Sequence, residues 1–260
     1  ESAAFESKVG GLDRYLGPWE KSLMVRFPSQ HRRRLLPFVS DLFDCGIEEV
    51  DDVFDRTMVE WRAFFSRWGA PLSPEEQRGL IGELLVLEEM LESGNPKVPA
   101  SWKGPADSLH DFEADDWHVE VKPSMRMDPT AMIHPIAQLD PMEKPLSLVM
   151  VRLKRGEGMT LPGKISQLRE HPSIKGSPDS ASHFEEMLGE IGYDRSDDHH
   201  YSTTYSDEFE FTRLDVNSSE SLLNSKTISS DAKYKDIRWI LLASQHDFQA
   251  CDSDFWKSPI

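Results

Sequence analysis

The stretch that decides the fold is HDFEADDWHVEVK, residues 110–122. It contains an acidic residue, a turn and a strand that carries Glu-x-Lys. Because side chains alternate along a strand, we expect Val119 and Val121 to face a core. Glu120 and Lys122 then share the opposite face, where carboxylates and an amine can gather in one small volume. Two carboxylates that share a hard cation such as Mg²⁺, next to a lysine, suit metal-assisted hydrolysis of a phosphodiester.

A plainer interpretation of the same residues stays open at this point. A hairpin with one solvated face also alternates polar and apolar residues, and Glu-x-Lys triplets are common. His118 has two interpretations for the same reason. It lies on the face of Glu120, where it could assist proton transfer or simply occupy an edge strand. The sequence on both sides of the stretch favours the metal site.

Upstream, the sequence predicts a helix over residues 74–93. Ser73 is a candidate N-cap, Pro74 fits the first helical position, and Glu76 completes a capping box. Gly94 is a plausible stop at the other end. The helical spacing of the apolar residues indicates one buried stripe, which consists of Leu80, Leu84, Leu87 and Leu91.

Two glycines interrupt this helix, at Gly79 and Gly82. Each costs helix stability by about 1 kcal/mol relative to alanine. Their spacing of three therefore indicates that the helix packs closely on a neighbour there. Glu83 follows directly and is a candidate site acid; the alternative is an exposed helix glutamate, as expected for Glu88, Glu89 and Glu92.

Five short motifs occur in order along the chain: GLIGEL at 79–84, HDF at 110–112, VEVK at 119–122, QLDP at 138–141 and LVMVRL at 148–153. This combination resembles a family of PD-(D/E)xK nucleases long described as a domain of unknown function. Members of that family are encoded beside bacterial restriction and phage-defence genes. The resemblance extends roughly from Trp19 to Trp239, and its specific part is the middle, residues 79–153.

The resemblance implies a set of site residues. Asp111, Glu120 and Lys122 match the signature triad, and Glu83 matches the helix acid often found in this superfamily. One position departs from the pattern, since His110 stands where the superfamily name has proline. That position is the laxest of the motif, so the departure changes little.

The resemblance also implies a cofactor, Mg²⁺, for which Mn²⁺ can substitute. Asp111 and Glu120 would bind it, with the backbone carbonyl of Val121 as a third ligand. Glu83 would bind the ion directly, through water, or position a second ion. Lys122 would orient the attacking water or stabilise charge on the phosphate.

The charge of the chain disfavours unaided DNA binding. Lys and Arg number 29 against 46 Asp and Glu, for a net charge of −17, whereas a lone DNA-binding domain is usually basic. Either the basic residues cluster, or a partner subunit holds the DNA. Arg152 and Lys154 share one face of a predicted strand beside the Glu120 strand and are candidate DNA contacts, as is Gln138 by the family pattern. Residues 32–34, three arginines, form a second basic run, for which a solvated helix face is the alternative.

The organisation of the chain is α/β. We expect a restriction-endonuclease-like core with a mixed central sheet flanked by helices, over residues 73–260 with a C-terminal extension. Residues 1–72 form an N-terminal, largely helical elaboration packed on that core. Predicted strands cover 22–27, 109–114, 117–123, 146–153 (central), 209–214 and 237–242, and predicted helices cover 32–45, 48–68, 164–170 and 182–191.

Composition indicates a globular cytoplasmic protein. Hydrophobic residues make up 38% of 260 residues, and the seven tryptophans are expected to pack in the core or in lids. Cys45 and Cys251 provide neither a disulfide framework nor a zinc set, so both are expected to be reduced thiols. No apolar run suits a signal peptide or a membrane span, and the start at Glu1 suggests processing or trimming. His199 and His200 could attract a metal, but a solvated loop is the alternative.

The function we expect is that of a Mg²⁺-dependent DNA endonuclease in a bacterial restriction or anti-phage defence system. An ATPase or helicase-like protein is the expected partner. The alternative is a catalytically silent nuclease-fold subunit that serves as a scaffold, which the net charge of −17 favours. A nuclease that acts on RNA or on modified DNA is a third possibility, because substrate choice lies in loops that carry no readable code.

Overall fold

The structure is a computed structural model that describes residues 7–9, 12–16, 23–26, 71–103, 108–219, 221–225 and 237–260. The chain divides into two units, residues 1–71 and 72–260. The first unit contains an antiparallel three-stranded sheet of β1 (Ser7–Val9), β2 (Leu12–Leu16) and β3 (Leu23–Arg26). The strand predicted at 22–27 is confirmed by β3. The helices predicted at 32–45 and 48–68, the arginine run 32–34 and Cys45 lie outside the described residues.

Helix α3 (Pro74–Glu92) begins and ends where the sequence predicts. The Glu76 N–H donates to Ser73 Oγ at 3.2 Å, and the Ser73 N–H donates to Glu76 Oε2 at 2.8 Å. This reciprocal pair is the expected capping box. Gly94 follows the helix with a φ of 77°, a conformation that suits glycine. The predicted stripe is buried throughout, at Leu80, Leu84, Leu87 and Leu91.

The central sheet has five strands in the order β12-β10-β7-β5-β4. Strands β5 (His118–Ser124) and β7 (Leu146–Arg152) run parallel to each other. The remaining neighbours pair antiparallel, and they are β4 (Phe112–Glu113), β10 (Glu210–Asp215) and β12 (Gln249–Ala250). Six of the seven residues of β7 are buried, which confirms its predicted central place.

The other elements surround this sheet. The further helices are α4 (Val98–Ser101), α5 (Leu161–Arg169), α6 (Pro172–Lys175), α7 (Pro178–Ile191) and α8 (Ser253–Lys257), with 3-10 turns η3 (Ile136–Leu139), η4 (Arg195–His200) and η5 (Ala243–Gln245). Two antiparallel strand pairs complete the unit, namely β6 (Thr130–Ile133) with β11 (Trp239–Leu242), and β8 (Gly158–Thr160) with β9 (Thr204–Ser206). None of the helices in the described part of the chain combines the length and hydrophobicity needed to cross a bilayer.

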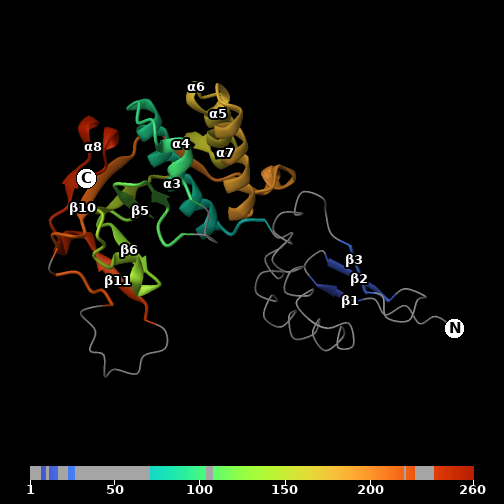
Figure 1. Ribbon diagram of the computed structural model, residues 1–260, viewed down its shortest axis with the longest axis horizontal. Helices are drawn as coiled ribbons and strands as arrows, with labels where there is room; N and C mark the ends of the chain where they lie inside the picture. The colour runs from blue at the N-terminus through green and yellow to red at the C-terminus, as the bar shows by residue number, and fades with distance from the viewer. Residues whose placement is uncertain are drawn as a thin grey trace. The chain divides into compact units, whose positions relative to one another are not determined.

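The two faces of the central sheet carry separate hydrophobic clusters. On β5 and β7, the residues Val119, Val121, Val149 and Val151 pack with apolar side chains of α3, α5 and α7. The alternate residues of β7, Leu146, Leu148 and Met150, belong to a second cluster with β6 and β11. Figure 1 shows α3, α5 and α7 grouped beside the sheet, with β6 and β11 apart from them. The alternation of side chains on these strands therefore sorts the core into two layers.

The polar side chains of β5 lie on the face of the second cluster. Glu120 is the register partner of Leu148, and Lys122 is that of Met150. The predicted alternation is thus confirmed, but this face is not solvated. Glu120 is only 1% exposed and His118 only 5%. The solvated-hairpin alternative is wrong for these two residues, because both are buried.

The order helix, hairpin, strand, helices, strand expected of a restriction-endonuclease-like core is present as α3, β4–β5, β7, α5–α7 and β10. The mixed five-stranded sheet flanked by helices agrees with that prediction. The strand predicted at 237–242 exists as β11, but it pairs with β6 outside the central sheet. The two units meet between residues 71 and 72, and the predicted packing of an N-terminal elaboration on the core stays a prediction.

Candidate functional site

The side chain of Asp111 binds the edge of β5 at a point that the short partner strand β4 does not reach. The β4–β5 ladder extends only as far as the pair of Phe112 with Val119. One residue before β4, the side chain of Asp111 turns to β5, and its Oδ2 accepts a hydrogen bond from the Val121 N–H at 2.7 Å. This bond fixes the carboxylate beside the Glu-x-Lys motif.

Glu120 and Lys122 form the centre of the site. Lys122 Nζ lies 2.6 Å from Glu120 Oε1, and it donates a hydrogen bond to Gln138 Oε1 at 3.1 Å. Both carboxylate oxygens of Glu120 are buried and have no well-aligned hydrogen bond among the described residues, although the Asp111 backbone N–H interacts with this carboxylate and acts to lower its pKa. Buried polar atoms normally have a partner. The carboxylate is therefore arranged to accept a further cationic ligand.

Helix α3 supplies a third carboxylate because Gly82 lets it approach β5. A Cβ at position 82 would lie 2.9 Å from Pro123 Cβ, closer than real side chains pack. The next residue, Glu83, lines the cleft, and its Oε2 accepts a hydrogen bond from Trp102 Nε1 at 3.0 Å. A Cβ at Gly79 would meet no atom within 4 Å. The predicted close approach thus occurs at Gly82, whereas Gly79 leaves open space in the cleft.

The three carboxylates and Lys122 open into one cleft of about 520 Å³. The acids occupy its more buried part. Exposed side chains surround its mouth, among them Arg126, Met132 and Ile240, and Arg78 lines the same cleft. Met132 and Ile240 are register partners on β6 and β11. The cleft therefore combines an acidic interior with basic and apolar side chains at its opening.

Burial dominates the electrostatics of this site. Together with the charge of Glu120, burial raises the pKa of Asp111 to about 8. Burial and then the charge of Asp111 raise the pKa of Glu83 well above its usual range. Burial also raises the pKa of Glu120, although Lys122 opposes this effect. For Lys122, burial acts to lower the pKa, but the three neighbouring carboxylates outweigh it and raise the pKa.

The residues present fit a hard divalent cation. Asp111, Glu120 and Glu83 offer only oxygen atoms, the donors that Mg²⁺, Mn²⁺ and Ca²⁺ prefer. If all three carboxylates ionise beside the single ammonium of Lys122, two negative charges remain uncompensated in the site. A divalent cation balances that charge, whereas a proton on Asp111 balances only half of it.

A comparison with protein families adds an independent finding. One family model, described as "Putative PD-(D/E)XK family member" and named DUF4420, matches residues 17–217, which is most of the chain. The chain belongs to this family. The recognition made from the sequence motifs is therefore confirmed. A search of curated proteins and a search of solved structures return no match.

The residues expected from the PD-(D/E)XK motif meet in the cleft. Asp111, Glu120, Val121, Lys122 and Gln138 all line it, together with the helix acid Glu83. The family's proline position is occupied by His110, which is 2% exposed and places its Nε2 at 3.2 Å from the Gln138 carbonyl oxygen.

The two basic residues expected to contact DNA are not at the cleft. Strand β7 does adjoin β5, as predicted. However, Arg152 donates to Glu210 Oε2 at 2.9 Å, and Lys154 donates to Glu208 Oε2 at 3.4 Å. Both cations are therefore engaged by acids at or beside β10, and neither lines the cleft.

Sequence reasoning missed three residues that line or support the site. Trp102 was assigned to packing, yet its indole N–H holds Glu83. Arg78 and Arg126 line the cleft but belong to no basic run. For Arg78 a signal existed, because it precedes Gly82 by four residues, which places both on one face of the predicted helix. No local pattern marks Trp102 or Arg126, since loops bring both to the cleft.

Proposed function

We propose that this protein is a Mg²⁺-dependent endonuclease that hydrolyses phosphodiester bonds in DNA, with Mn²⁺ as an effective substitute. The observation that carries the proposal is the convergence of Asp111, Glu120 and Lys122 in one cleft. Glu83 adds a carboxylate there, and both buried carboxylate oxygens of Glu120 have no well-aligned hydrogen bond among the described residues. Membership of the PD-(D/E)XK family supports the same chemistry.

Each residue has a separate role in this proposal. Asp111 and Glu120 bind the ion, the Val121 carbonyl is a third ligand, and Glu83 binds it directly or through water. When bound, a divalent ion polarises the scissile phosphate and lowers the pKa of the attacking water. Lys122 lies 2.6 Å from Glu120 Oε1, so its ammonium is placed to orient that water or to stabilise charge on the phosphate.

The mouth of the cleft is where the substrate backbone would enter. Arg126 is exposed there and can contact a phosphate, and Gln138 holds Lys122 in place. Arg152 and Lys154 would reach flanking DNA only after they leave Glu210 and Glu208. Among the described residues, the cations that line the cleft are thus Arg78, Lys122 and Arg126, a small number for gripping DNA in a chain of net charge −17.

The small number of cations among the described residues of the cleft also indicates that a partner subunit holds the DNA. We propose that the protein acts in the cytoplasm as one component of a restriction or anti-phage defence system. An ATPase or helicase-like subunit would hold the DNA, and this chain would cut it. The second candidate function is a silent scaffold, which the same acidic surface favours. The intact carboxylate and lysine set in the cleft favours catalysis instead.

The test is cleavage of supercoiled plasmid DNA by the purified chain, alone and with its candidate partner subunits, in Mg²⁺, Mn²⁺ or EDTA. A parallel reaction contains structured RNA. Nicking or linearisation that requires the divalent ion is expected. Lys122→Ala and Glu120→Gln should each reduce the rate at least about 100-fold, the scale for losing one group that stabilises charge in a transition state.

The matched control is Glu92→Gln on the exposed side of α3, where the Glu92 side chain is 70% exposed and its Oε1 lies 3.4 Å from His171 Nε2. This variant should cleave like the unmodified protein. If Lys122→Ala and Glu120→Gln stay folded and retain full cleavage or defence activity, the nuclease proposal fails and the scaffold takes its place. Cleavage of RNA in preference to DNA would correct the substrate.

A further inference from the structure

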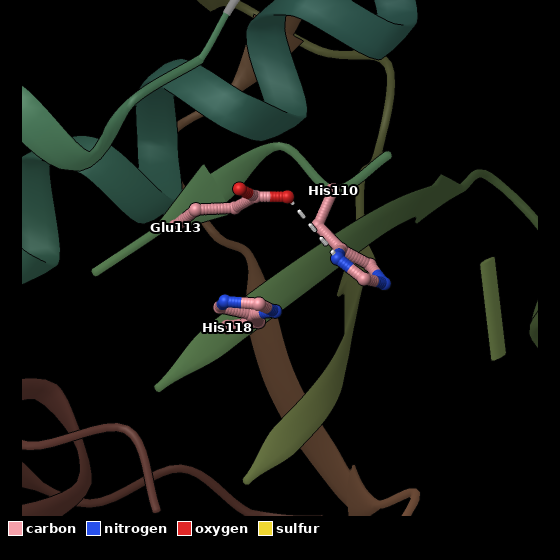
Figure 2. A group of neighbouring side chains, drawn as sticks. All are labelled: His110, Glu113 and His118. Carbon is pink, nitrogen blue, oxygen red and sulfur yellow. Dashed lines mark ion pairs between the residues drawn. The ribbon is translucent and has the colours of Figure 1, made fainter. Parts of the chain in front are cut away.

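A second polar cluster lies at the other end of the β4–β5 hairpin, made of His110, Glu113 and His118. We propose that these three residues bind one transition-metal ion, Zn²⁺ by preference, at a site separate from the carboxylate cleft. One ligand atom from each side chain lies within 4.8 Å of the other two. Figure 2 shows the three side chains converging, with Glu113 on β4, His118 on β5 and His110 just before β4.

Backbone pairing holds two of the three residues together. Glu113 is the register partner of His118 across the antiparallel pair β4–β5, so the two side chains leave the sheet on the same face. His110 joins them from three residues before Glu113, and its ring centroid lies 5.2 Å from that of His118. The cluster is therefore built on the hairpin itself.

The separation of His110 Nδ1 and Glu113 Oε1 matches a tetrahedral metal site. These atoms are 3.4 Å apart and form an ion pair when His110 is protonated, which Figure 2 marks with a dashed line. A tetrahedron with an edge of this length has its centre about 2.1 Å from each corner, which is the usual Zn–N and Zn–O distance. The ligand atom of His118 lies within 4.8 Å of both atoms, so His118 would have to move toward them for all three residues to bind one ion.

An independent observation is that His118 keeps a buried nitrogen without a hydrogen-bond partner. His110 is 2% exposed and His118 is 5% exposed. Among the described residues, His118 Nδ1 has no hydrogen-bond partner, and the contact of His110 Nδ1 with Glu113 Oε1 is long, at 3.4 Å. A buried imidazole nitrogen without a partner is costly in a metal-free protein, and an ion held between the two rings and the carboxylate would remove that cost.

The donor types distinguish this site from the carboxylate cleft. Two imidazoles and one carboxylate suit zinc, which takes nitrogen donors at about 2.0–2.1 Å, whereas Mg²⁺ prefers oxygen donors alone. Glu113 is 29% exposed on its side chain. A water molecule can therefore reach the fourth position from that side.

The geometry gives the ion a role in positioning the cleft. The ring of His110 uses its other nitrogen, Nε2, to meet the Gln138 carbonyl oxygen at 3.2 Å. The side chain of the same Gln138 accepts a hydrogen bond from Lys122 at 3.1 Å. A metal-bound His110 must donate through Nε2, because its Nδ1 carries the ion. Zinc would thus fix the segment that holds Lys122.

The experiment is a zinc titration of the full chain after EDTA treatment and dialysis, followed with a chromophoric competitor and checked by metal analysis. Cobalt(II) then replaces zinc as a spectroscopic probe. The unmodified protein should bind one equivalent of zinc at this site and show the visible absorption of four-coordinate cobalt. Glu113→Gln and His118→Ala should each weaken zinc binding by on the order of 100-fold or more and abolish that absorption.

Glu113→Gln is the decisive variant. Glutamine has nearly the shape of glutamate, and the Glu113 side chain is partly exposed, so the circular dichroism spectrum and the melting curve should not change. Two control variants test whether zinc binds elsewhere in the chain. The double variant His199→Ala, His200→Ala removes an exposed histidine pair, and Glu120→Gln removes the carboxylate cleft; both should keep the zinc equivalent and the cobalt spectrum. No zinc bound by the unmodified protein, or zinc bound unchanged by folded Glu113→Gln, overturns the proposal. Loss of zinc in Glu120→Gln alone also overturns it, because the ion would then lie in the cleft.

Discussion

The N-terminal end of β5 carries His118, and the part of the strand that lines the cleft, called here the cleft end, carries Glu120 and Lys122. Both groups lie on the same face of the sheet, yet they differ in chemistry. At the N-terminal end, His118 faces Glu113 across a paired strand, and the donors are mostly nitrogen. Two residues later, Glu120 lies beyond the end of β4, and the donors around it are oxygen. A single alternating strand therefore supports two different polar sites.

The difference in donor atoms comes from the segment that lies next to β5 at each of these two places. Where β4 pairs with β5, a residue of β4 must be the neighbour, and that residue is Glu113. Past the end of β4, the edge is open to side chains from elsewhere. Asp111 binds the Val121 N–H there, and α3 brings in Glu83. The local partner, rather than the strand, thus sets the metal preference at each end.

The sharpest test of this comparison is a pair of isosteric changes, one at each end. Glu120→Gln should lower Mg²⁺-dependent cleavage at least about 100-fold and keep zinc binding. Glu113→Gln should lose zinc binding and keep Mg²⁺ binding at the cleft. Cleavage rates and isothermal titration with each metal measure the two effects. If one change abolishes the binding of both metals, the two ends form a single site and the comparison fails.

The pH dependence of stability should have opposite signs at the two ends in EDTA. Burial and Glu120 raise the pKa of Asp111 to about 8, so the folded state holds a proton that the unfolded chain releases above about pH 4. Stability from this group is therefore lost progressively as the pH rises from about 4 to about 8. Burial lowers the pKa of His110 and His118. As the pH falls, the unfolded chain therefore binds protons at these histidines before the folded chain does. Stability is lost below about pH 6.5.

The free energy of unfolding, measured in urea from pH 5 to pH 9, gives both pH dependences. Asp111→Asn should flatten the decline in stability between about pH 6.5 and pH 8. It should also make the metal-free protein more stable than the parent at pH 8, because the neutral amide can still accept from Val121. His118→Asn should flatten the acidic slope. A decline toward pH 8 that Asp111→Asn leaves unchanged would show that Asp111 is already ionised at neutral pH in the folded chain.

The glycines of α3 give a third test, which concerns how the cleft end is built. Gly82→Ala places a Cβ at 2.9 Å from Pro123 Cβ. Because a proline ring cannot move aside, the helix must shift, at a cost of about 1–3 kcal/mol. Gly79→Ala meets no atom within 4 Å and should stabilise the helix by up to about 1 kcal/mol. Denaturant midpoints of the two variants measure these values, and equal effects would refute the close approach at Gly82.

The smallest expected effect concerns the arginine at the mouth of the cleft. Arg126→Ala should raise the dissociation constant for DNA a few-fold and reduce the slope of log K against log salt by about 1, as expected for one lost phosphate contact. The control is Lys257→Ala, which removes a lysine paired with Asp254 on α8. Fluorescence anisotropy at several salt concentrations, with Ca²⁺ in place of Mg²⁺, measures both. An equal change in the two variants would remove Arg126 from the DNA path.

Local patterns in the sequence predict the main elements well. The capping box at Ser73 and the leucine stripe define α3 within one residue of its observed end. The apolar run of β7 predicts a central strand, and the alternation after Trp117 predicts which face of β5 holds Glu120. These features depend on neighbours in the chain, so a sequence can display them.

Long-range contacts could not be predicted in this way. The indole of Trp102 reaches Glu83 from a loop, and Glu210 and Glu208 occupy the two cations that were expected to contact DNA. Strand β11 leaves the central sheet to pair with β6. Each outcome depends on which segments pack together, and no spacing within one segment records that choice.

The sequence by itself determined the order of elements, the family and the residue types available for chemistry, because periodicity, caps and motifs are properties of adjacent residues. Tertiary structure alone decided that the polar face of β5 is buried, with Glu120 at 1% exposure. It also decided that Asp111 and Glu83 share a cleft with Lys122, while His110 and Glu113 gather around His118. Burial and proximity are sums over distant segments, so only the folded chain can set them.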